Sequence, residues 1–447
     1  MLLKILFLFT LFFSNILSAS LLLIDSEKFT FKEFEIAKFV DQSNKLSIED
    51  IQKQDFTLIV PNAYSNGFVP HTSIWHKFSI TNQLSSKQEF ILHDALYYLP
   101  FELDLYILNS NGEKVYSYTD SQHLMSFFPL SIEPYETYTI YIKSYFLSGI
   151  SSLFDYSIYD RESHSQSIVY ENILLAFLLG GILTLIFYNL LIFFYTRDRV
   201  YFYYVAYLFF SFIIGFVFVS GFAHKLFDIT HNSWIHNATY ATPLTVIFIL
   251  LFTSAVFEMK KFYPKLYLFF IISISFVGLY TLLSVLFGLL DYLPIIMGFG
   301  LIVGFMIVFI GIYMTYTKNK LGVIYLISTT SYAVFAIITI LYYLGLLPTN
   351  LLTSNALIFG SLLEGFGLSL LLAYRINLLK AQNSALELLS STDGLTGLYN
   401  RRHFNEVTPA EINKAKRDHK IFAFAILDID NFKNTMITMD TKRVIRY

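Results

Sequence analysis

The 447-residue chain has no cysteine and few charged residues. Without cysteine it can form neither disulfides nor thiolate metal sites, and thiol catalysis is excluded. Charged residues make up 14% of the chain, whereas a soluble domain carries about 25%. The net charge of −2 provides no bulk electrostatic attraction to nucleic acid. With 55% hydrophobic residues, the composition is that of a membrane protein with room for flanking domains.

Seven apolar segments separated by short polar loops lie between residues 168 and 375. A helix needs about 20 residues to cross a hydrocarbon core of about 30 Å, and inside lipid only helices satisfy the backbone of such segments. We therefore predict a seven-helix transmembrane bundle. Its spans are 168–195, 200–222, 237–257, 264–287, 293–315, 321–346 and 351–374.

Basic residues are distributed unequally between the two sets of loops. Nine follow the odd-numbered spans, whereas the loops after the even-numbered spans carry only Lys225. The nine are Arg197, Arg199, Lys260, Lys261, Lys265, Lys318, Lys320, Arg375 and Lys380. Lys and Arg are enriched in cytoplasmic loops, so we expect the amino-terminal part outside the cytoplasm and the carboxyl terminus inside. In a bacterium this is a multi-pass protein of the inner (cytoplasmic) membrane with a periplasmic amino-terminal domain.

Residues 1–20 have the layout of a secretory signal peptide. Lys4 is followed by an apolar run to about Leu17 and then by the small residues Ser18, Ala19 and Ser20. The alternative is an uncleaved anchor. In both cases the residues that follow are exported.

Residues 21–165 contain short apolar or alternating runs separated by turn signals, the pattern of a β-sandwich. Asn111-Gly112 between two such runs predicts a hairpin. An exported sandwich ahead of seven helices indicates a sensory or ligand-binding domain. Trp75, Tyr97, Tyr98 and Tyr106 could stack on a sugar ring, or they fill the sandwich core. The spacing of His71, His76 and His93 matches no compact metal site.

Charged side chains inside the spans are candidates for function. Glu171 and Glu258 lie near span ends, where both can reach the interface, whereas Glu364 is deeper and could pair with a partner on another helix. The alternative for Glu364 is a carboxyl used in helix packing. No chain of buried ionisable residues crosses the membrane, so a transporter or channel is weakly supported.

Two stretches of the membrane region resemble the bacterial seven-transmembrane receptors with diverse intracellular signalling modules. They are Gly180–Leu190 running into Arg197–Tyr204, and Leu363–Gly365 continuing through Ser369–Ile376. In that family an exported β-sandwich precedes the membrane helices, often with a Trp-x-x-Phe-x-x-x-Asn strand, which Trp75, Phe78 and Asn82 match. The resemblance covers about residues 25–375 and implies a receptor.

A helical linker, 376–390, follows the last span. Its apolar residues Ile376, Leu379, Leu386 and Leu389 form a short heptad-like seam that could pair with a second subunit, or the segment is a plain amphipathic linker. From 391 the sequence resembles GGDEF domains, the diguanylate cyclases, because Asp393–Arg402 matches their Asp-x-Leu-Thr-Gly-Leu-x-Asn-Arg-Arg signature. This resemblance implies an α/β domain that uses GTP and Mg²⁺ and acts as a homodimer.

The segment Phe422–Lys433 is expected to be a buried apolar strand ending in two carboxylates. Hard cations prefer carboxylate oxygen, so such a strand end suits Mg²⁺. The resemblance implies metal ligation by Asp428 and the Ile429 carbonyl, and backbone contact of Phe432 and Lys433 with the GTP phosphates.

The match to GGDEF domains stops after Asn434, and residues 435–447 form an aberrant tail. Met436 and Ile445 stand at the guanine-binding positions, and the signature hairpin with the second metal carboxylate is missing. With chosen synonymous codons, a neighbouring reading frame encodes Tyr-Asn-Asp-Asn-Tyr-Gly-His-Gln-Ala-Gly-Asp, which resembles the missing segment. We therefore expect a one-base deletion after the Asn434 codon, and a 447-residue polypeptide that is truncated and catalytically inactive.

Two functions follow from these patterns. One is a membrane-bound receptor whose intact form makes cyclic di-GMP from two GTP. The alternative is a non-catalytic seven-transmembrane sensor or remnant that binds a small ligand such as a carbohydrate.

Overall fold

The computed structural model describes residues 21–427 and residue 430, except for 68, 70, 97–101, 121–125, 147–151, 228–237, 239, 288–292, 345, 349, 394 and 395. The chain divides into two units, Met1–Leu371 and Leu372–Tyr447. The predicted signal peptide lies outside the described residues.

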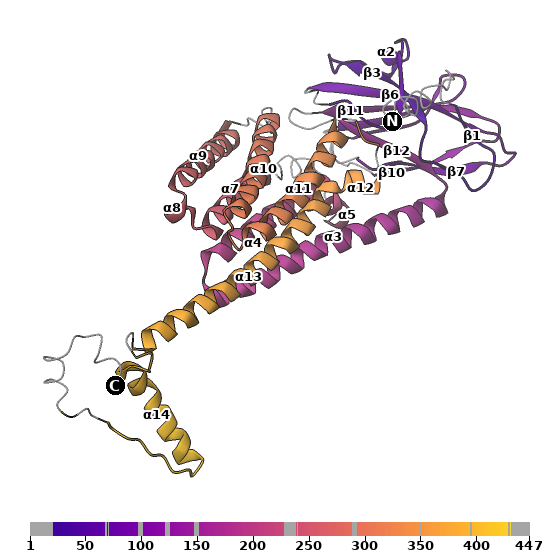
Figure 1. The fold of residues 1–447 in the computed structure, drawn as a ribbon. Helices are drawn as coiled ribbons and strands as arrows, with labels where there is room; N and C mark the ends of the chain where they lie inside the picture. Colours follow the sequence, from indigo (N-terminus) through magenta and orange to yellow (C-terminus); the bar gives the residue numbers. More distant parts are fainter. Residues whose placement is uncertain are drawn as a thin grey trace, which may run out of the picture. The chain divides into compact units, whose positions relative to one another are not determined.

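The amino-terminal domain is built from two sheets, as predicted (Figure 1). The first has the order β4 (Leu58–Pro61), β3 (Glu35–Asp41), β6 (Thr72–Asn82), β11 (Thr137–Phe146), β8 (Glu102–Leu108) and β9 (Lys114–Asp120), with β1 (Leu21–Ile24) paired in parallel to β6. The second has the order β10 (Phe127–Ile132), β7 (Gln88–Asp94), β12 (Leu153–Tyr159) and β2 (Thr30–Phe31), with β5 (Ala63–Ser65) also on β12.

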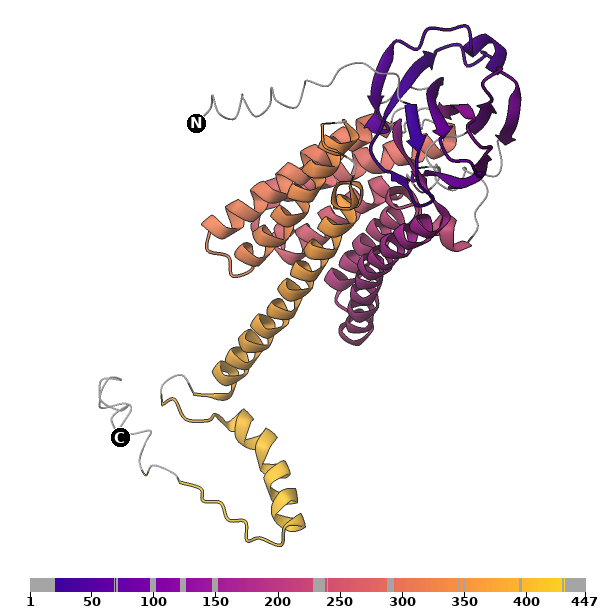
Figure 2. The same cartoon turned by 90° about the vertical axis from the view of Figure 1, so that its right-hand side faces the viewer.

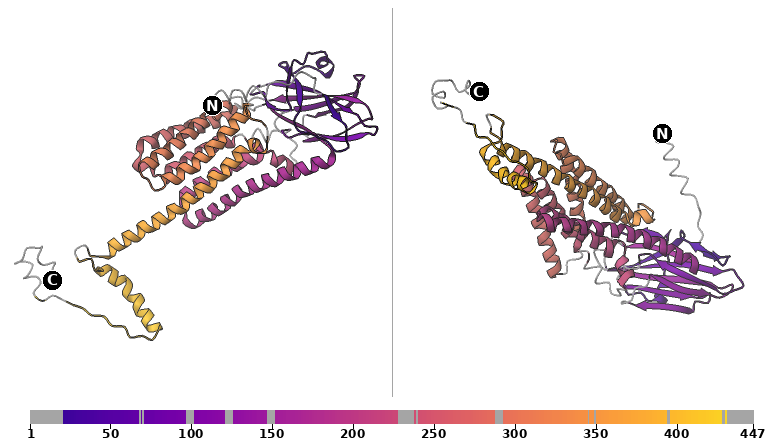
Figure 3. Two further views of the ribbon diagram at one scale, coloured as in Figure 1. Left: turned by 45° about the vertical axis from the view of Figure 1, so that its right-hand side comes forward. Right: turned by 90° about the horizontal axis from the view of Figure 1, so that it is seen from below.

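Alternation along β6 explains how the first sheet is covered on both faces. Ile74, His76, Phe78 and Ile80 are buried, and the His76 ring contacts Tyr156 of the second sheet. Side chains alternate between the two faces of a strand, so Trp75 points to the opposite face. There the short helix α2 (Ile48–Ile51) covers it with Ile48 and Ile51. The views in Figure 3 show the strands gathered in one domain.

The hairpin predicted at Asn111-Gly112 is confirmed between β8 and β9, which pair in antiparallel orientation. Gly112 has a φ of 79°, a left-handed conformation that glycine adopts at little cost. Asn109 stabilises the turn because its side-chain oxygen accepts hydrogen bonds from the backbone N–H of Asn111 and Glu113, at 3.0 and 2.9 Å.

A series of helices follows the β-domain. They are α3 (Arg161–Thr196), α4 (Arg199–Ile213) continued by the π-helix η1 (Ile214–Val219), α5 (Phe222–Phe227), α7 (Ala241–Val256), α8 (Met259–Phe262), α9 (Pro264–Phe287), α10 (Leu293–Tyr316), α11 (Gly322–Tyr343), α12 (Leu351–Ser354) and α13 (Ala356–Ser391). Among the described residues, six helices are long and apolar enough to cross a membrane. The predicted span 237–257 contains α7, an apolar helix of 16 residues.

Two helices extend beyond the predicted spans. Helix α3 begins seven residues earlier, at Arg161 rather than at 168, because its first two turns are polar and carry no hydropathy signal. Helix α13 continues through the predicted linker to Ser391 as one helix of 36 residues, which confirms that the linker continues the last span (Figure 2). The second unit also contains α14 (Arg401–Arg417).

Candidate functional site

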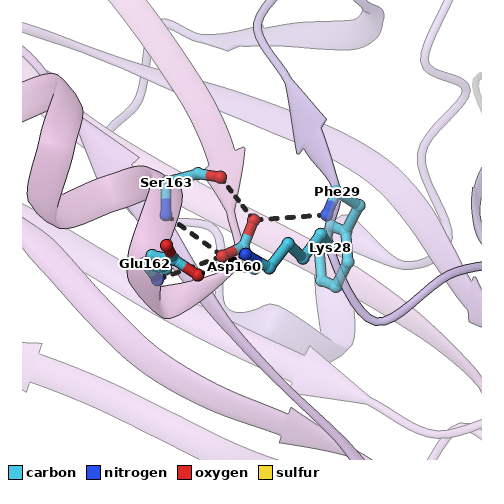
Figure 4. Close-up of polar contacts among 5 residues, drawn as sticks. All are labelled: Lys28, Phe29, Asp160, Glu162 and Ser163. Atoms are coloured by element: carbon cyan, nitrogen blue, oxygen red, sulfur yellow. Dashed lines mark hydrogen bonds and ion pairs between the residues drawn. The ribbon is translucent and has the colours of Figure 1, made fainter.

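The β-domain passes into the first membrane helix without a linker, since β12 ends at Tyr159 and α3 begins at Arg161. Asp160 between them caps the helix (Figure 4). Its Oδ1 accepts hydrogen bonds from the N–H of Glu162 and Ser163 at 3.0 and 3.1 Å. Its Oδ2 accepts from Ser163 Oγ at 2.6 Å and from the N–H of Phe29 at 3.2 Å. One buried carboxylate thus joins the helix start to the segment before β2.

The electrostatics of this junction favour the ionised form of Asp160. Burial alone would raise the pKa of the carboxyl, but the hydrogen bonds from Ser163, Phe29 and Glu162 outweigh burial and lower it. The backbone strengthens the same connection, because the Asp160 N–H donates to the Phe29 carbonyl at 3.0 Å. An exposed ion pair joins Lys28 to Glu162 at 2.6 Å (Figure 4).

His164, one turn into α3, is buried against the second sheet. Its ring centroid lies 5.2 Å from that of His93 on β7, 5.6 Å from that of Tyr159 on β12 and 5.3 Å from that of Phe127 on β10. The first turn of α3 therefore packs as part of the β-domain core.

Of the four aromatic residues predicted as candidates for ligand stacking, two lie among the described residues. Trp75 is 1% exposed, stacks on Tyr106 with ring centroids 6.0 Å apart, and lies in a cluster with Ile48 and Ile51. This burial favours the alternative in which Trp75 fills a core. Tyr106 is partly buried beside it, and Tyr97 and Tyr98 lie outside the described residues.

The three histidines His71, His76 and His93 lie in different surroundings. His76 lies between the sheets, where Tyr64 Oη is 3.0 Å from Nε2 and Tyr156 Oη is 3.2 Å from Nδ1. Burial, with a smaller effect of Lys38, lowers its pKa to about 3, so the ring is neutral. His71 is near Tyr145, and His93 contacts His164. Within the described part of the chain, no three His, Asp or Glu side chains form a potential metal site.

Asp94, at the end of β7, is a buried carboxyl outside the membrane segments. Burial, to which the charge of Asp155 adds, raises its pKa to about 7, although its Oδ1 accepts a hydrogen bond from the Leu96 N–H at 2.9 Å. Burial raises the pKa of Asp155 on β12 to about 7 as well. The amino-terminal domain therefore carries two carboxyls that bind protons near neutral pH.

Glu364 on α13 is buried in the helix bundle and accepts a hydrogen bond from the Tyr207 hydroxyl of α4. Glu364 therefore pairs with a side chain on another helix, one of the two interpretations that the sequence allowed. Three further polar contacts lie within the next two turns of α13. Tyr204 Oη donates to the Gly365 carbonyl and lies 3.0 Å from Ser369 Oγ, to which Asn189 Nδ2 of α3 donates at 3.0 Å. These five side chains, Asn189, Tyr204, Tyr207, Glu364 and Ser369, form what we call the polar helix network.

The signature segment at Asp393 folds as a tight turn followed by a capped helix. Asp393 Oδ1 accepts from the N–H and the hydroxyl of Thr396, both at 3.0 Å, and the Gly397 N–H donates to the Asp393 carbonyl at 2.9 Å. Asn400 then caps α14, since its side-chain oxygen accepts from the His403 N–H at 3.0 Å. A turn and then a capped helix with the basic residues Arg401 and Arg402 at its start are thus present in this order.

The prediction of a buried strand after α14 is wrong for the described residues. Residues 420–427 form no strand, and Ile421, Ile426 and Leu427 are 99%, 86% and 94% exposed. A strand requires neighbours for its N–H and C=O groups, and the described part of this unit offers none to this segment. The predicted site residues Asp428, Ile429, Phe432 and Lys433, and also Met436 and Ile445, lie outside the described residues.

Sequence reasoning missed most residues of the junction and the polar helix network. Asp160 had a usable signal, since an Asp directly before a helix is a favoured cap. Asn189, Tyr204, Tyr207 and Ser369 gave no signal of the contacts they make, because the partner of each lies on another helix.

Family models match three successive stretches of the chain. The model "7TMR-DISM extracellular 2" matches residues 34–149, "7TM diverse intracellular signalling" matches 171–375, and "Diguanylate cyclase, GGDEF domain" matches 390–437.

Among curated proteins, "Probable diguanylate cyclase DgcC" of Escherichia coli K12 is 39% identical over 49 residues, which are 11% of this chain and 13% of that protein. The protein of the same name from Escherichia coli O6:H1 gives the same values. The similarity thus spans 13% of the length of these relatives. With the three matched domains in this order, the chain belongs to the seven-transmembrane receptors with diverse intracellular signalling modules, of the type in which a GGDEF sequence follows the membrane domain.

Proposed function

We propose that the protein is a membrane-bound signal-transduction receptor of the diguanylate cyclase type, whose intact form condenses two GTP into cyclic di-GMP. The order of the domains carries this proposal: a β-domain, a membrane domain and then a GGDEF sequence. The folded turn at Asp393 and the capped start of α14 support it, because they put the family signature in a defined local structure.

The orientation is part of the proposal. One set of loops carries nine basic residues and the other carries one. This distribution favours a protein of a bacterial inner membrane with its β-domain in the periplasm and its carboxyl terminus in the cytoplasm. The domain limits that we propose are 1–20 for the signal peptide, 21–165, 168–375, 376–390, 391–434 and 435–447. A small ligand outside the cytoplasm is the input, and its chemical class stays open.

We further propose that the 447-residue polypeptide itself makes no cyclic di-GMP. Phosphoryl transfer requires metal ions to neutralise the triphosphate charge, and Asp428 is the carboxylate that the family resemblance assigns to them. Met436 and Ile445 offer guanine no side-chain hydrogen bonds, and each unpaired polar group on the buried base costs about 1–3 kcal/mol. In intact relatives Mg²⁺ and a homodimer complete the site, because the product joins two GTP.

The test compares two genes in a bacterial strain that lacks other cyclases. One encodes the 447-residue polypeptide, and the other has one T restored after the Asn434 codon and continues into the native downstream DNA. Cyclic di-GMP is measured by mass spectrometry. We expect none from the first gene and synthesis from the second, which Asp428→Asn should abolish.

Each other outcome removes one part of the proposal. Product from the 447-residue polypeptide would overturn the proposed inactivity. A stop codon soon after the restored base would overturn the frameshift. A restored protein that accumulates in the membrane without making product would favour the non-catalytic receptor.

A further inference from the structure

We propose that α3 transmits a rearrangement of the β-domain across the membrane. The Phe29–Asp160 contact attaches α3 to the β-domain at one end. At the other end, α3 passes the movement to the face of α13 that packs against it. This inference rests on the proposed receptor function and adds to it a route and the residues that form it.

The Phe29–Asp160 contact attaches α3 to the β-domain because the two carboxylate oxygens of Asp160 bind different partners. Oδ1 accepts only from backbone N–H groups of α3, at 3.0 and 3.1 Å, and so caps the helix. Oδ2 accepts from Phe29 at 3.2 Å and thereby connects the helix to the segment that continues into β2. Strand β2 pairs with β12 through Thr30–Tyr159 and Phe31–Ile158, so both segments entering the junction belong to one sheet.

The first turn of α3 therefore cannot rotate independently of the second sheet. Rotation would break the bonds to Phe29 and withdraw His164 from its contacts with His93, Tyr159 and Phe127. The Lys28–Glu162 ion pair adds little, because both side chains are more than half exposed and such pairs contribute about 0–1 kcal/mol.

At the other end, successive turns of α3 contact successive turns of α13. A methyl group added to Gly181 would lie 2.8 Å from Leu362 Cδ1, and one added to Gly365 would lie 3.2 Å from Leu185 Cδ1. Asn189 then donates to Ser369 at 3.0 Å. The contacts 181–362, 185–365 and 189–369 advance together along both helices, so the two helices run parallel with their turns in register. A shift of α3 along or about its axis must therefore disturb α13.

Helix α3 is suited to this role because it is one helix of 36 residues. From Asp160 to Asn189 it spans 29 residues, or about 44 Å at 1.5 Å per residue. A signal along this route requires that ligand binds two arrangements of the β-domain with different affinity. Because packed turns interlock rather than slide freely, a shift of α3 changes the contacts that α13 makes with it.

The cysteine-free chain permits a direct test in membranes with the full-length protein. Cysteines are placed at Gly181→Cys and Leu362→Cys, which removes the leucine side chain that the new cysteine would meet, and the rate of disulfide formation is measured with a mild oxidant. Asp160→Asn and Lys28→Ala are then introduced separately into this double-cysteine protein. Asparagine keeps an oxygen to cap α3, but its NH₂ group meets the Phe29 N–H, donor against donor. Lys28→Ala is the matched control, since it removes only the exposed ion pair.

We expect Asp160→Asn to change the disulfide rate at least about 3-fold and Lys28→Ala to leave it unchanged. If Asp160→Asn does not accumulate in the membrane, Asp160→Ser takes its place, because serine keeps one oxygen to cap α3 and has no second oxygen to accept from the Phe29 N–H. Equal rates in the parent and in the tested junction variant, or an equal change in Lys28→Ala, would overturn the proposal. The readout needs no cyclase activity, so its failure is separate from failure of the proposed function.

Discussion

The Tyr207–Glu364 hydrogen bond gives the sharpest prediction about the membrane domain. Glu364 is 2% exposed, and the Tyr207 hydroxyl is the hydrogen-bond donor that the described residues provide to its carboxyl. Tyr207→Phe leaves that carboxyl buried without its donor. An orphaned buried polar group costs about 1–3 kcal/mol. Interhelical hydrogen bonds in membranes have measured coupling energies that average about 0.6 and reach about 1.7 kcal/mol.

A double-mutant cycle separates the interaction from the loss of packing. We expect Tyr207→Phe to lower the free energy of unfolding by about 1–2 kcal/mol. In a Glu364→Leu background, where no carboxyl remains to be orphaned, the same change should cost much less. The free energies come from reversible unfolding of the full chain in mixed micelles. Tyr240→Phe serves as a control, since Tyr240 Oη donates instead to the Ser284 carbonyl at 3.2 Å.

The reasoning is refuted if the two changes are additive within about 0.5 kcal/mol, the agreement expected of independent sites. Coupling of equal size between Glu364 and Tyr240 would refute it as well, because it would show a general loss of packing.

The remaining predictions concern the β-domain. Residues 21–165 expressed alone should give a β-rich circular dichroism spectrum and a cooperative melt, and a helical or unfolded spectrum would remove the sandwich interpretation. Burial raises the pKa of Asp94 from 3.8 to about 7, so the folded domain binds a proton that the unfolded chain has released. Its stability should therefore fall as pH rises from about 4 to about 7, by at most about 4 kcal/mol from this group. Asp94→Asn should remove that part of the pH dependence, and identical pH profiles of melting temperature in parent and variant would contradict it.

The sequence predicted the membrane spans well because hydropathy is a local property. The span predicted at 264–287 coincides with α9, where Pro264 begins the helix. The start of α3 was missed because Arg161–Ser167 is polar. Its first turn is capped by Asp160, which also binds Phe29, 131 residues away in the chain.

Contacts between distant segments were beyond the reach of sequence reasoning. The pattern of β6 places Trp75 on one face of the strand, but it does not say that α2 covers that face. The apolar run Phe422–Leu427 has the composition of a buried strand, but burial depends on neighbouring strands that the described residues do not supply. The polar helix network likewise joins residues up to 180 positions apart.

The orientation of the chain is the claim on which the receptor proposal most depends, and reporter fusions test it directly. Alkaline phosphatase is active only outside the cytoplasm, so it is fused after Asn232, in the loop following the second predicted span, and after Lys320, in the loop following the fifth. Asn232 itself lies outside the described residues. The distribution of basic residues predicts activity for the fusion at Asn232 and none for the fusion at Lys320. Activity at Lys320 would reverse the orientation, place the GGDEF sequence outside the cytoplasm, and contradict the account.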